Sequence, residues 1–250
     1  NNLNTVMNIF YNYKKIVMFK KIAYKAVSLA HIGSVKFVFF MQNLLNVTHN
    51  YQPNPFKYSK LNDKKNRNSF DRYDAIFNNL PNIPTTLIDF GCSRGFFVLQ
   101  AANQGIFSIG VDHDRFEILY AKSVSEINNV DKALFMHSEI NKELIGTLPK
   151  FEMTICTSIF HHWVRIYGKK SAFRMMQLIA DNTTKYLVFE TGQNNETDTR
   201  FYPYLEFMGD NYESWIVSFL SELGFSEIKK IGNYGSRVSD VKRALFLAIK

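Results

Sequence analysis

The chain has 250 residues, of which 46% are apolar, and it carries a formal net charge of +8. This length and apolar content suffice for one sizeable folded domain with an appendage. The two cysteines, Cys92 and Cys156, argue against a disulfide scaffold and fit a reduced, cytoplasmic setting. No C-x-x-C or H-E-x-x-H spacing occurs, so the sequence predicts no metal site, and it predicts no cleavable signal peptide.

The positive charge is concentrated at the start of the chain. Residues 1–70 carry eleven Lys or Arg and a single acid, whereas residues 71–250 are slightly acidic. Such a segment fits RNA or an anionic membrane surface, and it equally fits a solvated basic face with no partner. An apolar stretch over 26–47 is interrupted by His, Lys, Gln and Asn, so it is a poor candidate for a membrane span.

The same region has a helical pattern that ends in a linker. Apolar residues recur at helical spacing over 8–29 with lysines on another face, and a second helix is expected around 35–45. Two prolines and many polar residues predict a linker over 48–68. We therefore predict a basic helical extension and linker over residues 1–69 and a folded domain over residues 70–250.

The folded domain shows strands alternating with helices, which predicts an α/β fold with a mostly parallel sheet and helices on both faces. Two strands in succession at the end of the chain favour an antiparallel hairpin at the sheet edge. The expected strands are Thr85–Phe90, Phe107–Asp112, Ala133–His137, Glu152–Ser158, Tyr186–Glu190, Glu227–Ile231 and Ala244–Ile249. The expected helices are Phe70–Asn79, Gly95–Gln104, Arg115–Ile127, Lys169–Asn182 and Tyr212–Leu223.

The stretch 85–112 carries the strongest functional signal. It reads as strand, glycine turn, helix and strand, with Asp89 in the first strand and Asp112 at the end of the second. This arrangement builds a nucleoside pocket at the carboxyl ends of the strands, where an acid can accept hydrogen bonds from both ribose hydroxyls. The turn has Gly91 and Gly95 but no third glycine, so it departs from the G-x-G-x-x-G pattern of dinucleotide folds.

From Thr85 onward the chain resembles class I S-adenosylmethionine (SAM) dependent methyltransferases, whose turn has the form E/D-x-G-x-G/S-x-G. The resemblance covers about Phe70–Lys250 and implies a Rossmann-like sheet of seven strands, the number predicted above. Ser93 stands where the central glycine is usual. The residues that we expect to contact SAM are Arg72, Asp89, Gly91, Cys92, Ser93, Gly95, Phe96, Asp112, His113, Ser138, Glu139 and Ser158. Within this set Asp112 is assigned to the ribose, Ser138 and Glu139 to adenine, and Arg72 (or Arg94 in the turn) to the SAM carboxylate.

Candidate catalytic residues follow the fourth and fifth strands, which end beside the methyl group in this fold. His161 and His162 come directly after the fourth strand, and a histidine there could take a proton from a hydroxyl nucleophile. Glu190 ends the fifth strand and could orient a histidine or accept a hydrogen bond from the substrate. Packing roles for the histidines and a structural role for the carboxylate are the alternatives.

A closer resemblance rests on the run TSIFHHWVRIYGKKSAFRMMQLIADNTTKYLVFETG together with DFGCSRGFF upstream. Both look like the methyltransferase half of O-antigen chain-terminating enzymes, which cap a surface polysaccharide. The resemblance implies O-methylation of a saccharide, a sugar phosphate or a related small acceptor. The alternatives are an RNA methyltransferase that uses the basic segment 1–70, and a non-catalytic scaffold with a methyltransferase fold. A cytoplasmic enzyme, peripheral at the membrane through the same segment, is the expected location.

Overall fold

The structure, a computed structural model, describes residues 52–56, 68–196, 200, 202–236 and 241–250. The expected basic helices over 8–29 and 35–45 therefore lie outside the described residues, as do their proposed RNA and membrane contacts. Within the described part of the chain, no helix combines the length and hydrophobicity that crossing a membrane requires.

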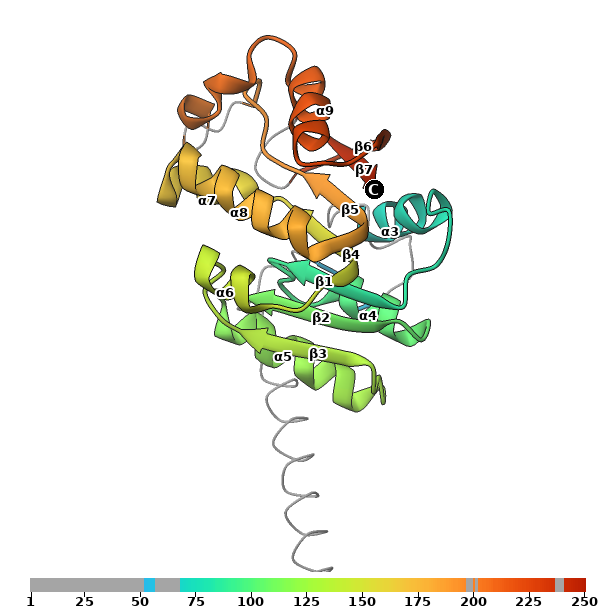
Figure 1. Ribbon diagram of the computed structural model, residues 1–250. Helices are drawn as coiled ribbons and strands as arrows, with labels where there is room; N and C mark the ends of the chain where they lie inside the picture. Colours follow the sequence, from blue (N-terminus) through green and yellow to red (C-terminus); the bar gives the residue numbers. More distant parts are fainter. Residues whose placement is uncertain (1–51, 57–67, 197–199, 201, 237–240) are drawn as a thin grey trace, which may run out of the picture. The chain divides into compact units, whose positions relative to one another are not determined.

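The described residues form one seven-stranded sheet in the order β3-β2-β1-β4-β5-β7-β6 (Figure 1). The first five strands run parallel, whereas β7 is antiparallel to both β5 and β6. The predicted α/β class, the Rossmann-like sheet and the C-terminal antiparallel pair are thus confirmed. The strands are β1 (Thr86–Phe90), β2 (Phe107–Asp112), β3 (Ala133–His137), β4 (Phe151–Thr157), β5 (Thr183–Glu190), β6 (Glu227–Tyr234) and β7 (Arg243–Ile249).

Helices cover both faces of the sheet. Neighbouring residues of each strand point to opposite faces, so each strand contributes apolar side chains to both helical layers. In β1, Leu87 packs with α3 and α4 on one face, and Ile88 packs with α7, α8 and α9 on the other. The helices are α3 (Ser69–Asn78), α4 (Phe96–Asn103), α5 (Arg115–Ile127), α6 (Lys142–Thr147), α7 (Phe160–Tyr167), α8 (Lys169–Asn182) and α9 (Tyr212–Glu222). Two short 3-10 turns, η1 (Tyr202–Tyr204) and η2 (Glu206–Met208), precede α9.

Two helices and two strands differ from the sequence prediction, among them β6, which ends at Tyr234 instead of Ile231. Helices α6 and α7 were not predicted, because six and eight residues are too few to show a clear helical period. Strand β5 begins at Thr183, directly after α8, instead of at Tyr186. The hydroxyl of Thr183 lies 2.7 Å from that of Thr154 on β4, so a buried contact between the strands favours the earlier start.

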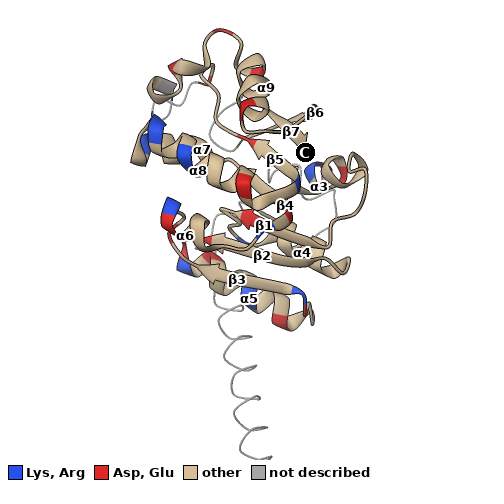
Figure 2. Cartoon of the chain, viewed as in Figure 1, with Lys and Arg blue, Asp and Glu red and all other residues tan. Residues whose placement is uncertain are grey.

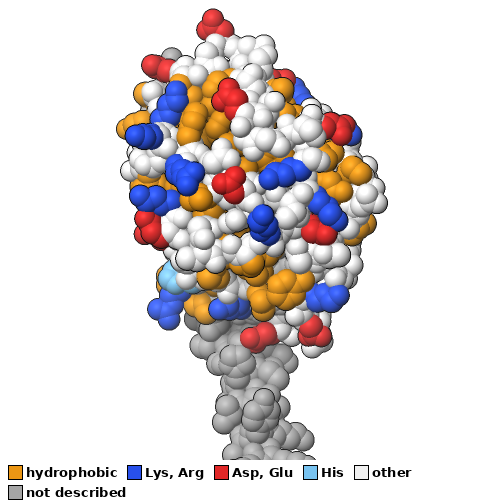
Figure 3. All heavy atoms as spheres, in the orientation of Figure 1, with side chains coloured by type: hydrophobic (Ala, Val, Ile, Leu, Met, Phe, Trp, Pro, Cys, Tyr) orange, Lys and Arg blue, Asp and Glu red, His pale blue; other side chains and the backbone are white. Residues whose placement is uncertain are grey.

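Charges of both signs are distributed over the helices and loops of the described domain (Figure 2). On the face shown in Figure 3, basic and acidic side chains alternate with apolar patches, and neither sign forms a continuous surface. This distribution agrees with the slight acidity of residues 71–250.

Candidate functional site

The glycine turn between β1 and α4 is built from three residues in the left-handed region. Gly91, Ser93 and Gly95 have φ of 76°, 48° and 75°. A Cβ on Gly95 would lie 2.4 Å from the ring of Phe135, so only glycine fits there. Ser93 takes the conformation that the usual glycine would take, at a cost of roughly 1–2 kcal/mol for a residue with a Cβ. The backbone path of the turn is therefore kept despite the substitution.

Asp112 is held beside this turn by backbone hydrogen bonds. The amide of Ser93 donates to Oδ2 at 2.8 Å, and the amide of Asp114 donates to Oδ1 at 2.9 Å. Nδ1 of the exposed His113 lies 3.2 Å from Oδ1. Oδ2 keeps a second lone pair for a ligand. The expected ribose acceptor is thus fixed in position at the end of β2.

Asp89 is buried next to Asp112. Burial, and secondarily the charge of Asp112, raise the pKa of the Asp89 carboxyl well above its usual value. Among the described residues, Oδ2 of Asp89 has no hydrogen-bond partner. A buried acceptor that lacks a donor fits a cationic ligand, and SAM carries both an ammonium and a sulfonium. The hydrogen-bond acceptors at the ends of β1 and β2 therefore suit SAM.

Two of the expected SAM contacts place their side chains elsewhere. The Sγ of Cys92 is buried against Gly110, and burial raises the pKa of this thiol far above its usual value. The ring of Phe96 is fully buried and packs edge-on against Phe70 and Phe97. At these two positions only the backbone is left to face a ligand. The amide of Phe96 already donates to Oε1 of Gln52 at 3.2 Å, a residue from the predicted linker.

The two candidate arginines have acidic partners. Arg72 on α3 forms a buried ion pair with Glu190 at 2.8 Å and donates to the carbonyl of Gly235 at 3.0 Å. Arg94 pairs with Glu117 at 3.0 Å, and its guanidinium lies over the ring of Tyr120. Each side chain thus has protein contacts, but Nη2 of Arg94 has no hydrogen-bond partner among the described residues. Binding of the SAM carboxylate by either arginine stays a prediction.

The expected adenine residues lie after β3. The amide of Ser138 donates to the carbonyl of Asp112 at 3.0 Å, which ties this loop to the end of β2. The exposed Glu139 accepts a hydrogen bond from the hydroxyl of Tyr167 at 2.5 Å. The loop is therefore connected both to the ribose corner and to the end of α7.

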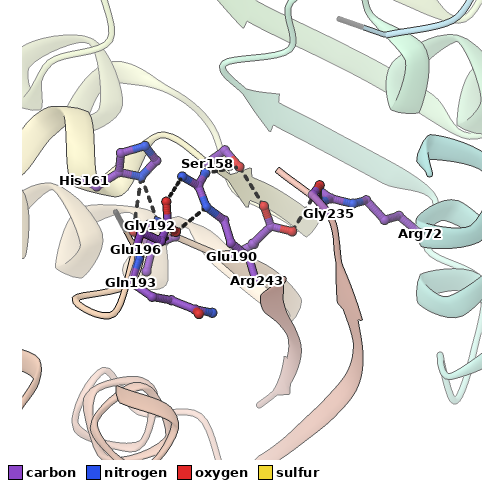
Figure 4. Close-up of polar contacts among 10 residues, drawn as sticks. Arg72, Ser158, His161, Glu190, Gly192, Gln193, Glu196, Gly235 and Arg243 are labelled. Carbon is purple, nitrogen blue, oxygen red and sulfur yellow. Dashed lines mark hydrogen bonds and ion pairs between the residues drawn. The ribbon is translucent and has the colours of Figure 1, made fainter. Parts of the chain in front are cut away.

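The sequence did not predict the polar network at the ends of β4 and β5 (Figure 4). Glu190 accepts a hydrogen bond from Oγ of Ser158 at 2.6 Å, in addition to its ion pair with Arg72. Arg243 donates to the same Ser158 at 3.2 Å and to both carboxylate oxygens of Glu196, at 2.6 and 2.7 Å. Glu190 is thus held by Ser158 and Arg72.

Glu196 and Arg243 lie 47 residues apart in the chain, so no local sequence pattern predicts their pairing.

A small polar pocket borders the network. It is lined by Gln52, Ser69, Arg72, Gly91, Phe97, Thr157 and Ser158. The pocket therefore connects the glycine turn with the end of β4, where the methyl group was expected.

His161 and His162 lie in the first turn of α7, with their ring centres 4.4 Å apart. His161 is 2% exposed, and its Nδ1 accepts a hydrogen bond from the amide of Gly192 at 2.9 Å. His162 is exposed on the surface. Desolvation by the surrounding protein, followed by the positive charges of Arg165 and Arg243, lowers the pKa of His162 to about 4. At neutral pH His162 is therefore uncharged and a weak base.

No group of three or more His, Cys, Asp or Glu with the geometry of a metal site occurs among the described residues. The site is thus made of carboxylates, arginines, histidines and backbone amides.

Comparison with known proteins connects this site to a group of enzymes. No family model matches the chain. The Escherichia coli O-antigen chain terminator bifunctional methyltransferase/kinase WbdD is 27% identical over 179 residues, which are 71% of this chain and 23% of the relative. The chain is therefore similar to WbdD over most of its length. It spans about a quarter of the length of that relative, and the resemblance inferred from the sequence is confirmed.

Solved structures agree on the fold. A WbdD structure with a kinase inhibitor superposes with a TM-score of 0.68 at 24% identity, covering 83% of this chain and 47% of that one. A magnesium protoporphyrin IX methyltransferase from Synechocystis PCC 6803, crystallised with SAM, superposes with a TM-score of 0.52 at 19% identity, covering 73% and 76%. The chain therefore has the fold of SAM-dependent methyltransferases.

Proposed function

We propose that this chain is a SAM-dependent O-methyltransferase whose acceptor is a saccharide or a sugar phosphate. The observation that carries the proposal is the corner formed by the glycine turn, Asp89 and Asp112, in a chain homologous to an O-antigen chain terminator. Asp112 accepts the ribose hydroxyls, and the unpartnered Oδ2 of Asp89 accepts a hydrogen bond from the ammonium of the donor. The backbone of Gly91, Ser93 and Gly95 lets the ligand approach closely.

Methyl transfer from a sulfonium uses a donor that is already activated, so the protein mainly aligns the acceptor oxygen with the methyl group. Ser158 at the end of β4 lines the pocket in which this alignment would occur. Ser138 and Glu139 remain the proposed adenine contacts. Glu190 acts in this proposal through Ser158 and Arg72, by fixing the floor of the pocket.

The charges around His162 favour an anionic acceptor. After desolvation, the positive charges of Arg165 and Arg243 lower the pKa of His162 most, and those of His113 and Arg200 act in the same direction, so the potential at this histidine is positive. Cationic groups at that point attract a phosphate, and Arg recognises phosphate oxygens well. A phosphate oxygen is anionic at neutral pH and needs no base, which suits a rim whose exposed histidine is a weak base.

Transfer of a labelled methyl group from SAM tests the proposal. The acceptors are matched oligosaccharides with and without a terminal phosphate, and a short RNA. We expect label in the phosphorylated saccharide, and a lower kcat/KM with Arg165→Gln because a positive charge leaves the rim. Arg115→Gln, at the start of α5, is the control and should leave kcat/KM unchanged.

Other outcomes of this assay have separate meanings. Label only in RNA, lost at raised salt, would support the RNA alternative and the basic segment 1–70. Absence of SAM binding would support the scaffold alternative. Ser93 was the only sequence feature that favoured a scaffold, and its backbone takes the same left-handed conformation as Gly91 and Gly95. A cytoplasmic location, and docking of residues 1–70 on an anionic membrane, stay predictions; liposome co-sedimentation with and without residues 1–50 tests the second.

A further inference from the structure

The segment 52–56, which the sequence predicts as part of a linker, contacts the folded domain at the glycine turn. Its two prolines fix their own φ and keep the residue before each of them in extended conformations. Oδ1 of Asn54 accepts a hydrogen bond from the amide of Phe56 at 2.9 Å, which stabilises a local turn. The backbone that carries Gln52 therefore has little conformational freedom to lose when a ligand binds.

The side chain of Gln52 is oriented by a backbone amide. It is 6% exposed, and its Oε1 accepts a hydrogen bond at 3.2 Å from the amide of Phe96, the first residue of α4. A backbone N–H can only donate, so the oxygen of the carboxamide is the atom that faces α4. The two N–H donors of Nε2 lie on the other side of the carboxamide. Gln52 also lines the small polar pocket, together with Gly91 and Ser158.

The proposed cofactor contacts place the amino-acid end of SAM at this pocket. Oδ2 of Asp89, near the end of β1, is the proposed acceptor for the ammonium of SAM. The ammonium and the carboxylate of an amino acid are bonded to the same carbon atom, so the carboxylate must lie near Asp89 too. Gly91 follows Asp89 by two residues and lines the pocket that Gln52 borders. A carboxylate at this position needs hydrogen-bond donors, and the Nε2 of Gln52 supplies them.

We propose that Gln52 recognises the carboxylate of SAM by donating a hydrogen bond from Nε2. This inference rests on the proposed function and adds to its cofactor site a residue from outside the strand–turn–helix motif. Hydrogen bonds to a charged acceptor are the strong ones, and the pocket excludes much of the competing water. Gln52 therefore distinguishes ligands that carry the amino-acid end from ligands that carry only the nucleoside.

The variant Gln52→Glu separates the two functions of this side chain. Glutamate keeps an oxygen for the amide of Phe96, but it lacks the N–H donors and brings a negative charge toward the carboxylate. We expect Gln52→Glu to lower the affinity for S-adenosylhomocysteine about 10- to 100-fold, the loss of one hydrogen bond to a charged group. The ligand 5′-methylthioadenosine has the same nucleoside but no carboxylate, so its affinity should stay within about 3-fold of the wild type. Gln100→Glu, which adds the same charge on α4 outside the pocket, is the control and should leave both affinities unchanged.

Calorimetric titration of both ligands above neutral pH, and the melting temperature without ligand, give readouts that do not depend on activity. The melting temperature of Gln52→Glu should match or exceed that of the wild type, because a negative charge is favourable at the first turn of α4. Gln52→Ala should melt lower, since the amide of Phe96 loses its acceptor. Equal falls in affinity for the two ligands, or an unchanged affinity of Gln52→Glu for S-adenosylhomocysteine, would overturn the inference. Failure of the proposed function would be seen separately, as a wild type that binds neither ligand.

Discussion

Replacing Arg243 by Met removes one half of the ion pair with Glu196, and the structure sets the size of the effect. Both side chains are 3% exposed, and the two hydrogen bonds between them measure 2.6 and 2.7 Å. Breaking a buried pair from one side leaves an uncompensated charge and lowers the free energy of unfolding by about 3–5 kcal/mol. For a domain of this size the melting temperature should fall by about 6–20 °C.

Urea unfolding of Arg243→Met, Glu196→Gln and the double variant measures the coupling between the two residues. The double variant should lose at least about 2 kcal/mol less than the sum of the single losses, because it leaves no unpaired charge. Glu227→Gln is the matched control, since it breaks the exposed 2.8 Å pair with Lys229 on β6. That change should lower the free energy of unfolding by less than about 1 kcal/mol. A loss in Arg243→Met no larger than in the control, or additive losses in the cycle, would refute the reasoning.

Three further predictions concern single residues of the site. Ser93→Gly should raise the free energy of unfolding by up to about 1 kcal/mol, because glycine adopts the φ of 48° without strain. Thermal denaturation measures this gain in stability. Ser93→Val should lose stability in the same assay. The raised pKa of Asp89 means that its charged form is disfavoured in the fold, so its contribution to stability falls as pH rises above about 4. Asp89→Asn should therefore melt higher at pH 7 than the wild type, and an unchanged or lower melting temperature would contradict this. The pKa of His162 is depressed to about 4, so its contribution is present above pH 6.5 and is lost as pH falls toward 4. His162→Gln should show a shallower loss of stability over that window, and identical pH profiles of the two proteins would argue against the depressed pKa.

The sequence predicts the sheet well because each parallel strand is a short apolar run between helical segments. The sequence also predicts Asp112 and the glycine turn, since their spacing follows from the strand–turn–helix geometry. The sequence does not predict helix α7, because a segment of eight residues is equally compatible with a loop after β4. The burial of the two histidines depends on that helix, whose first turn buries His161 and exposes His162.

The residues that hold the site together are those that sequence reasoning could not supply. Arg72 and Glu190 are 118 positions apart, and their ion pair depends on how α3 packs against the end of β5. The same holds for Arg243, which enters the network only because β7 lies between β5 and β6. Cys92 and Phe96 were placed among the cofactor contacts by proximity to the motif, whereas the direction of their side chains into the core is a property of packing.

Calorimetric titration of SAM and S-adenosylhomocysteine into the purified wild-type chain and into Asp112→Ala tests the central claim most directly. We expect micromolar binding of both ligands to the wild type and none to the folded variant, because the ribose acceptor at the end of β2 is gone. A wild type that binds neither ligand, or an Asp112→Ala protein that binds SAM as tightly as the wild type, would contradict the assignment of this corner as the cofactor site.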